Sequence, residues 1–175
     1  MDLRLLNRAM RAEAKGLGLC DKWYGEWSED SSVDELLNKY MKGIDFCIRN
    51  DYPSNSTMLE YAGREKLHEH GIFIDEEITE SSRGMIVING HCTGRVNYDG
   101  FNVGDVYVLG NSEVTINVSD FAKVFVEVWG DARVTVINKG ENRCFVYRHG
   151  GEVHTKGDVV IRDKTMEQTA EKTIG

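Results

Sequence analysis

Three observations predict a mainly β fold with a small all-α N-terminal part. They are a change of residue types near position 80, helix signals before it and a ten-residue repeat after it. Residues 1–80 contain nine Leu and one Val, whereas residues 81–175 contain one Leu and sixteen Val. Leucine favours helices, and β-branched valine favours strands. We therefore expect a helical cap domain over 1–80, a repetitive β domain over 81–164 and a polar tail over 165–175.

The N-terminal part carries the signals of three helices. Apolar residues recur at helical spacing, and Ser32 with Glu35 forms a capping box at the start of the second helix. The helices are expected at about 3–16, 32–50 and 56–70, followed by a short strand or docking segment at 72–74. Three short helices are also typical of a helix-turn-helix DNA reader. However, the third helix is rich in glutamate and the chain has a net charge of -8, so we expect no nucleic-acid partner.

A repeat of ten residues runs through the second half. Each unit begins with Gly or Asp, has a charged fourth residue and continues as Val-x-Val or a close variant. The register is held by Val114, Val124, Val134 and Cys144. Alternation within a unit predicts that Val126 points inward and Glu127 outward.

Two architectures fit such units. In a parallel β-helix, two units make one coil of about twenty residues, and equivalent residues stack in ladders. In an antiparallel β-sandwich or meander, the Gly-Asn and Gly-Asp pairs are hairpin turns. Strict register favours a parallel β-helix (solenoid) of about four coils.

The repeat also resembles a known group of sequences. The units, most clearly residues 129–134 (Trp-Gly-Asp-Ala-Arg-Val), are similar to single-stranded β-helix repeats of uncharacterised phage and mobile-element proteins. The segments 19–24 and 43–47 resemble the helical N-terminal parts of those proteins. The resemblance implies a fold and a phage or mobile-element origin, and it carries no catalytic residues.

Histidines suggest an alternative, enzymatic function. His149 and His154 are five residues apart, and His91 is a candidate third ligand for zinc. Such a site would resemble the left-handed β-helix enzymes, which include zinc-dependent hydratases of the gamma carbonic anhydrase type and acyltransferases. Their six-residue repeat is absent here, so metal ligation by these histidines remains only an alternative.

Other features bear on the compartment, the membrane and the chemistry of the protein. The four cysteines form no CxxC pair, which is typical of reduced, cytoplasmic thiols. There is no run of eighteen apolar residues and no signal peptide, so we expect no membrane partner. We expect no catalytic residues and no cofactor, while the question of an enzyme stays open.

Surface aromatic residues are the remaining signal. Trp23, Tyr24 and Trp27 lie within five residues and are candidates for a partner-binding patch; alternatively, they seal the helical part onto the β domain. Aromatic side chains at outward or corner positions of the repeat predict a homo-oligomer: Phe121, Phe125, Phe145 and Tyr147. The leading hypothesis is a non-enzymatic structural or adaptor protein that acts through protein–protein contacts.

Overall fold

The computed structural model describes residues 2–166, which leaves all but the first two residues of the expected tail outside it. The chain divides into two compact units between His70 and Gly71. This division lies about ten residues ahead of the change in composition. The reason is that two short strands, β1 (Ile72–Ile74) and β2 (Glu77–Ser81), pair with later strands and belong to the β unit.

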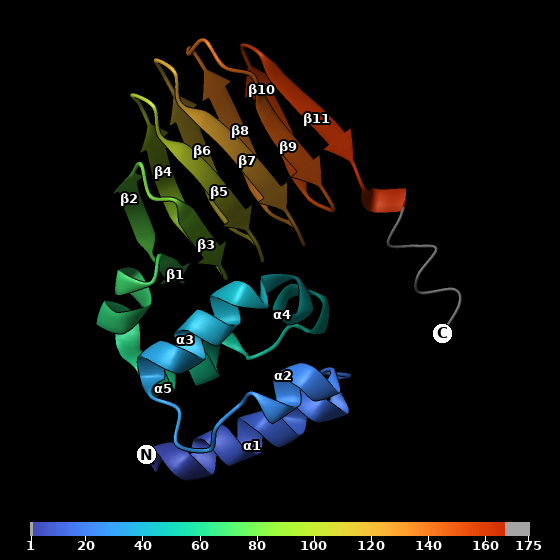
Figure 1. Cartoon of the computed structure of the whole chain (residues 1–175). Coiled ribbons are helices and arrows are strands. Elements are labelled where there is room, and N and C mark those ends of the chain that lie inside the picture. Colours follow the sequence, from blue (N-terminus) through green and yellow to red (C-terminus); the bar gives the residue numbers. More distant parts are fainter. Residues whose placement is uncertain (1, 167–175) are drawn as a thin grey trace. The chain divides into compact units, whose positions relative to one another are not determined.

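The first unit is helical (Figure 1) and consists of α1 (Leu3–Gly16), α2 (Asp21–Gly25), α3 (Val33–Lys42), α4 (Ile44–Asn50) and α5 (Asn55–Glu69). The capping box is confirmed, since the Ser32 side chain accepts from the Glu35 amide and the Glu35 side chain accepts from the Ser32 amide. Among residues 2–166, no helix is long and apolar enough to cross a membrane.

The expectation of one continuous helix over 32–50 is wrong. The helix breaks at Gly43, whose φ of -103° and ψ of 25° end α3 and begin α4. The indole of Trp23 lies 3.3 Å from the position that a Cβ of Gly43 would occupy. A side chain at this position would therefore crowd the tryptophan. The short α2, which carries Trp23, was not expected because a single turn is too short to show periodicity.

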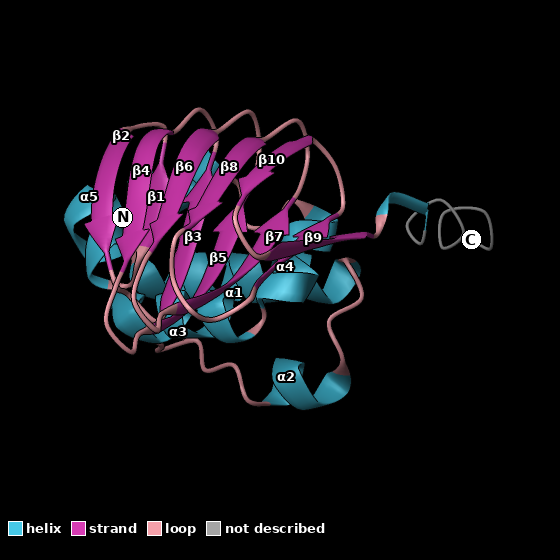
Figure 2. Ribbon diagram, turned by 90° about the horizontal axis from the view of Figure 1, so that it is seen from above, coloured by secondary structure: helices cyan, strands magenta, loops and turns pink. Residues whose placement is uncertain are grey.

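The second unit is a parallel β-solenoid of about four turns. One sheet has six strands in the order β1-β3-β5-β7-β9-β11 and the other has five in the order β10-β8-β6-β4-β2. Figure 2 shows the strands stacked side by side along the solenoid. The remaining strands are β3 (Met85–Asn89), β4 (Thr93–Tyr98), β5 (Val103–Val108), β6 (Glu113–Val118), β7 (Lys123–Val128), β8 (Arg133–Asn138), β9 (Cys144–Arg148), β10 (Glu152–Lys156) and β11 (Val159–Asp163).

The register confirms the β-helix and excludes the antiparallel alternative. Every strand pair is parallel, and partners are twenty residues apart in the repeat, as in Val114 with Val134 and Val126 with Val146. One coil therefore takes two ten-residue units. Gly110 and Asp120 begin their units in the left-handed region, with φ of 68° and 53°, which explains the Gly or Asp at this place.

The solenoid core consists of the inward ladders. Val124, Val126 and Val128 are fully buried, while the residues between them face outward. The ladder that contains Val124 has a gap at Gly104, which pairs with Val124. The buried ring of Tyr98 fills that space, and its hydroxyl donates a 2.7 Å hydrogen bond to the Arg83 carbonyl.

Candidate functional site

The aromatic cluster proposed as a partner-binding patch lies in the helical unit, on and just after α2. Trp27 is only 8% exposed, and its indole Nε1 donates a 2.9 Å hydrogen bond to Asn7 Oδ1. The ring of Tyr24 packs under the guanidinium of Arg11, at 4.0 Å from its centroid. Trp23 lines a cavity. Trp27 lines the same cavity, so the two tryptophans share one site inside the helical unit, while Tyr24 packs separately against Arg11.

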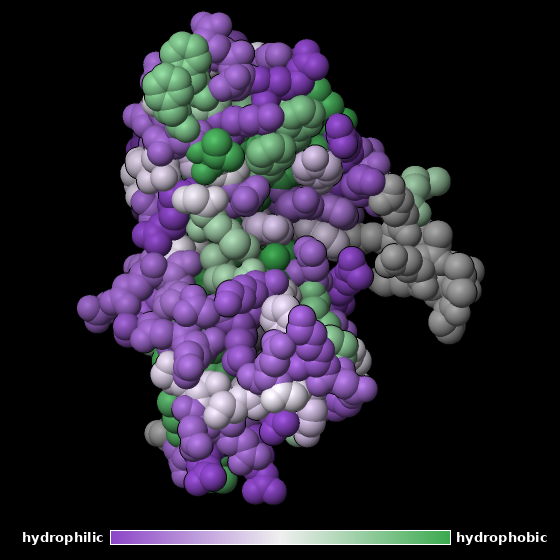
Figure 3. Space-filling view, viewed as in Figure 1, coloured by the Kyte–Doolittle hydropathy of each residue, from purple (hydrophilic) through white to green (hydrophobic). Residues whose placement is uncertain are grey.

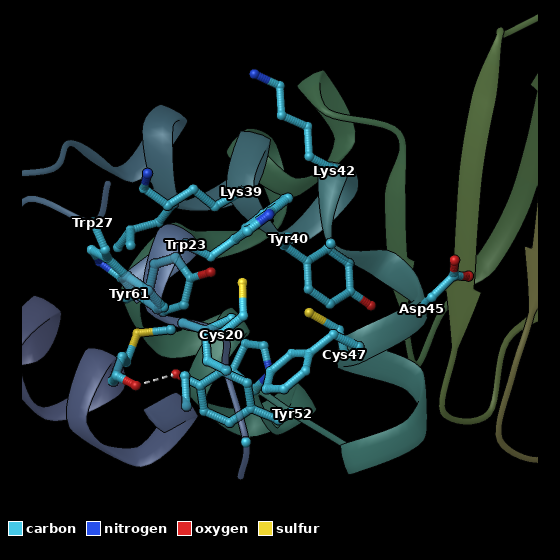
Figure 4. Close-up of a pocket in the computed structure, with 18 residues that line it drawn as sticks. Cys20, Trp23, Trp27, Lys39, Tyr40, Lys42, Asp45, Cys47, Tyr52 and Tyr61 are labelled. Carbon is cyan, nitrogen blue, oxygen red and sulfur yellow. Dashed lines mark hydrogen bonds between the residues drawn. The ribbon is translucent and has the colours of Figure 1, made fainter. Parts of the chain in front are cut away.

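Residues of the helical unit line the cavity, which is partly open to solvent and has a volume of about 360 Å³. Figure 4 shows aromatic rings around it and the thiols of Cys20 and Cys47 pointing into it. Burial raises the pKa of the Cys47 thiol to about 12. Sequence reasoning missed this cavity because its walls come from separate helices, and only their packing brings them together.

The three candidate zinc ligands stand in different surroundings. His91 Nδ1 lies 3.5 Å from Asp75 Oδ1, whereas His149 Nε2 lies 2.6 Å from Glu127 Oε2. His154 is exposed on β10. Within residues 2–166, no group of three or more His, Cys, Asp or Glu is arranged to hold a metal ion. The zinc-enzyme alternative therefore has no ligand set in this part of the chain.

The buried cysteines are poor nucleophiles. All four cysteines are free thiols, and Cys47, Cys92 and Cys144 are buried. Burial is the main cause that raises the pKa of each of these three thiols. Because the thiolate is the reactive form, these groups are protonated and unreactive near neutral pH.

The outward side of the six-stranded sheet carries most of the exposed aromatic surface of the solenoid. At one corner, Phe101 and Phe121 stack at a centroid distance of 5.0 Å and are 83% and 50% exposed. On the strands, Phe125 and Phe145 stack at 5.7 Å. We call this surface the aromatic face, and it comprises Phe101, Val103, Tyr107, Phe121, Phe125, Phe145 and Tyr147. Figure 3 shows hydrophobic side chains gathered among polar ones over this part of the solenoid.

Cations cover part of the aromatic face. The Lys123 ammonium lies 5.1 Å from the centroid of Phe125, and the Arg162 guanidinium lies 5.5 Å from that of Phe145. Acidic side chains, Asp105 and Glu127, occupy neighbouring outward positions. Flat aromatic surface with arginine nearby and charges of both signs is typical of protein interfaces.

The opposite side of the solenoid is different in kind. Outward positions of the five-stranded sheet hold small polar residues, including the pairs Thr115 with Thr135 and Asn97 with Asn117. Asn117 Nδ2 donates a 3.0 Å hydrogen bond to Asn97 Oδ1. With polar side chains at these outward positions, this side offers less apolar surface to a partner.

Sequence reasoning found part of the aromatic face and missed its most exposed members. The outward or corner positions of Phe121, Phe125, Phe145 and Tyr147 are confirmed. Phe101 and Val103, at 83% and 55% exposure, were not singled out. Counting back one coil of twenty residues would have identified both positions. Phe101 lies one coil before Phe121, and Val103 lies one coil before Lys123.

Comparison of the chain with protein-family models, with curated proteins and with solved structures finds no match in any of the three. A function for the chain must therefore be inferred from its fold and from the chemistry of its surfaces.

Proposed function

We propose that the protein is a non-enzymatic structural or adaptor protein, which acts in the cytoplasm through protein–protein contacts of its aromatic face. The single observation behind this proposal is the exposed stack of Phe101 and Phe121 on the same face as the half-buried stack of Phe125 and Phe145. Phe101, Val103 and Phe121 each expose half or more of their surface. Contiguous exposed apolar surface of this kind marks interaction sites in folded proteins. We also propose a phage or mobile-element origin, which rests on the sequence resemblance alone.

The partner that fits this face best is a second copy of the chain. A two-fold axis places the same surface on both sides of an interface, so the surface must complement itself. The aromatic face does so in two respects. Its stacked rings can pack against the same rings, and it carries both outward cations, Lys123 and Arg162, and outward acids, Asp105 and Glu127. Two opposed copies can therefore pair unlike charges around an apolar centre.

Sedimentation equilibrium of the full chain tests the proposal. The two-fold arrangement predicts a dimer at tens of micromolar, and we expect the double variant Phe101→Ser, Phe121→Ser to be monomeric. Both side chains are exposed, so their replacement leaves the core ladders intact.

The matched control is Ile137→Ser, which removes an outward apolar side chain from the five-stranded sheet instead. This variant is expected to associate like the wild type. A monomeric wild-type chain at these concentrations, or a double variant that still associates fully, would overturn the proposed role of the aromatic face.

A further inference from the structure

The cavity of the helical unit is large enough for a small organic molecule. Its volume is about 360 Å³, and an apolar protein cavity of about 150 Å³ already binds benzene. Aromatic side chains form much of its wall: Trp23, Trp27, Tyr40, Phe46, Tyr52 and Tyr61. A cavity of this size and lining has room for a planar molecule of two fused rings.

One polar group on the wall has no protein partner. Tyr61 is only 9% exposed. Its hydroxyl is buried and makes no hydrogen bond within the described residues. Figure 4 shows this hydroxyl pointing into the cavity. The neighbouring polar groups differ, because the Tyr52 hydroxyl donates to the Met10 carbonyl at 2.7 Å and the Trp27 indole donates to Asn7. A buried hydroxyl without a partner is costly, and a ligand that hydrogen-bonds to it removes that cost.

The charged groups of the lining residues do not face the cavity. Aromatic walls also suit a quaternary ammonium ion. Here, however, the carboxylate of Asp45, the one acid among the lining residues, points away from the cavity, as does the ammonium of Lys42 (Figure 4). The cavity therefore offers no carboxylate to balance a bound cation and suits a neutral molecule.

We propose that this cavity binds a planar two-ring aromatic compound that carries a hydroxyl or carbonyl group, with the Tyr61 hydroxyl as its hydrogen-bond partner. The site lies wholly in the helical unit and does not depend on the aromatic face, so either proposal can fail without the other. Trp23 and the side chains facing it hold the rings, and Tyr61 orients them.

Calorimetric titration of the full chain with 2-naphthol tests the site, with naphthalene as the probe that lacks the hydroxyl. We expect saturable binding of one 2-naphthol per chain. In Tyr61→Phe, which keeps the ring, 2-naphthol should bind about fivefold more weakly, while naphthalene should bind as it does to the wild type. Equal binding of 2-naphthol by both proteins would overturn the role of Tyr61.

Two further variants locate the binding. Cys20 lines the cavity and is exposed, so Cys20→Phe should narrow the cavity and abolish binding without disturbing the core. Leu17→Phe is the matched control, because Leu17 is a nearby exposed residue that does not line the cavity. The Leu17→Phe variant should bind 2-naphthol as the wild type does.

A second measurement avoids any dependence on the folding of variants. Bound 2-naphthol should protect the wild-type Cys20 thiol, which is exposed and lines the cavity, from alkylation by iodoacetamide at pH 8. Unchanged alkylation, no binding of either probe, or tighter binding of tetramethylammonium than of 2-naphthol would each overturn the proposal.

Discussion

At the scale of single residues, Val126 and Glu127 show how strictly the strand alternation is enforced. Val126 is fully buried between the sheets, whereas Glu127 points outward and lies 2.6 Å from His149. A carboxylate at position 126 would be buried without a partner, at a cost of several kcal/mol, which is comparable with the stability of a whole domain. We expect Val126→Asp to abolish folding of the β unit in thermal melts followed by circular dichroism.

The matched control introduces the same residue on the outward side. Thr135 is half-buried on β8 and its side chain faces away from the core. Thr135→Asp should change the free energy of unfolding by less than about 1 kcal/mol. If this variant were the more damaging of the two, the inside–outside assignment of the strands would be wrong.

The four thiols offer a second test at this scale. Burial raises the pKa of Cys47 to about 12, so only about one molecule in ten thousand carries the thiolate at pH 8. Cys20 is exposed. We expect iodoacetamide at pH 8 to modify Cys20 in the folded protein and to modify Cys47 only in urea, as read by mass spectrometry. Equal labelling of both in the folded protein would contradict the burial of Cys47.

At the scale of elements, β5 depends on the absence of a side chain at Gly104. A Cβ there would collide with the ring of Tyr98, whose hydroxyl donates a hydrogen bond to the Arg83 carbonyl. Overpacking of this kind costs typically about 1–3 kcal/mol. We expect Gly104→Ala to lower the midpoint of urea unfolding clearly. Gly84→Ala is the control, since nothing lies within 4 Å of its added Cβ, and it should have little effect.

Helices α3 and α5 are joined by a polar contact with a defined pH dependence. Asp34, on α3, lies 3.0 Å from His70 Nε2 and 3.2 Å from Lys66 Nζ. The hydrogen bond from His70, followed by that from Lys66, lowers the pKa of the Asp34 carboxyl. A carboxyl whose pKa is lowered by folding stabilises the protein above its unfolded pKa, and this contribution is lost as the pH falls through the folded pKa.

We therefore expect Asp34→Asn to lower the melting temperature at pH 7 and to have a smaller effect at pH 2. Asp45→Asn, on α4, is the control and should show no such pH-dependent difference. Thermal melts of the wild type and both variants at the two pH values measure this. An equal loss at both pH values would show that the charge of Asp34 is not the cause.

At the scale of the whole molecule, the proposed dimer should respond to salt in a characteristic way. Exposed ion pairs are screened by salt, whereas the burial of apolar surface is not weakened by it. Because the aromatic face is centred on stacked rings, we expect association to persist at 1 M NaCl in sedimentation equilibrium. Dissociation at high salt would show that the surrounding charges, rather than the rings, hold the copies together.

Much of the fold followed from local signals. The capping box of Ser32 and Glu35 marked a helix start because it depends on residues three apart. The coil of two units followed from the ten-residue register, since parallel ladders place like residues on like residues. The break at Gly43 did not follow from such signals, because apolar residues recur at helical spacing on both sides of it.

The sequence by itself determined which side chains alternate inward and outward, because a strand has a period of two and each unit repeats it. Only the tertiary structure decided which outward residues become neighbours. Phe101 meets Phe121 because a coil takes twenty residues, and the rings that line the cavity meet because separate helices pack together. Both surfaces arise from contacts between residues distant in the chain, which no local pattern records.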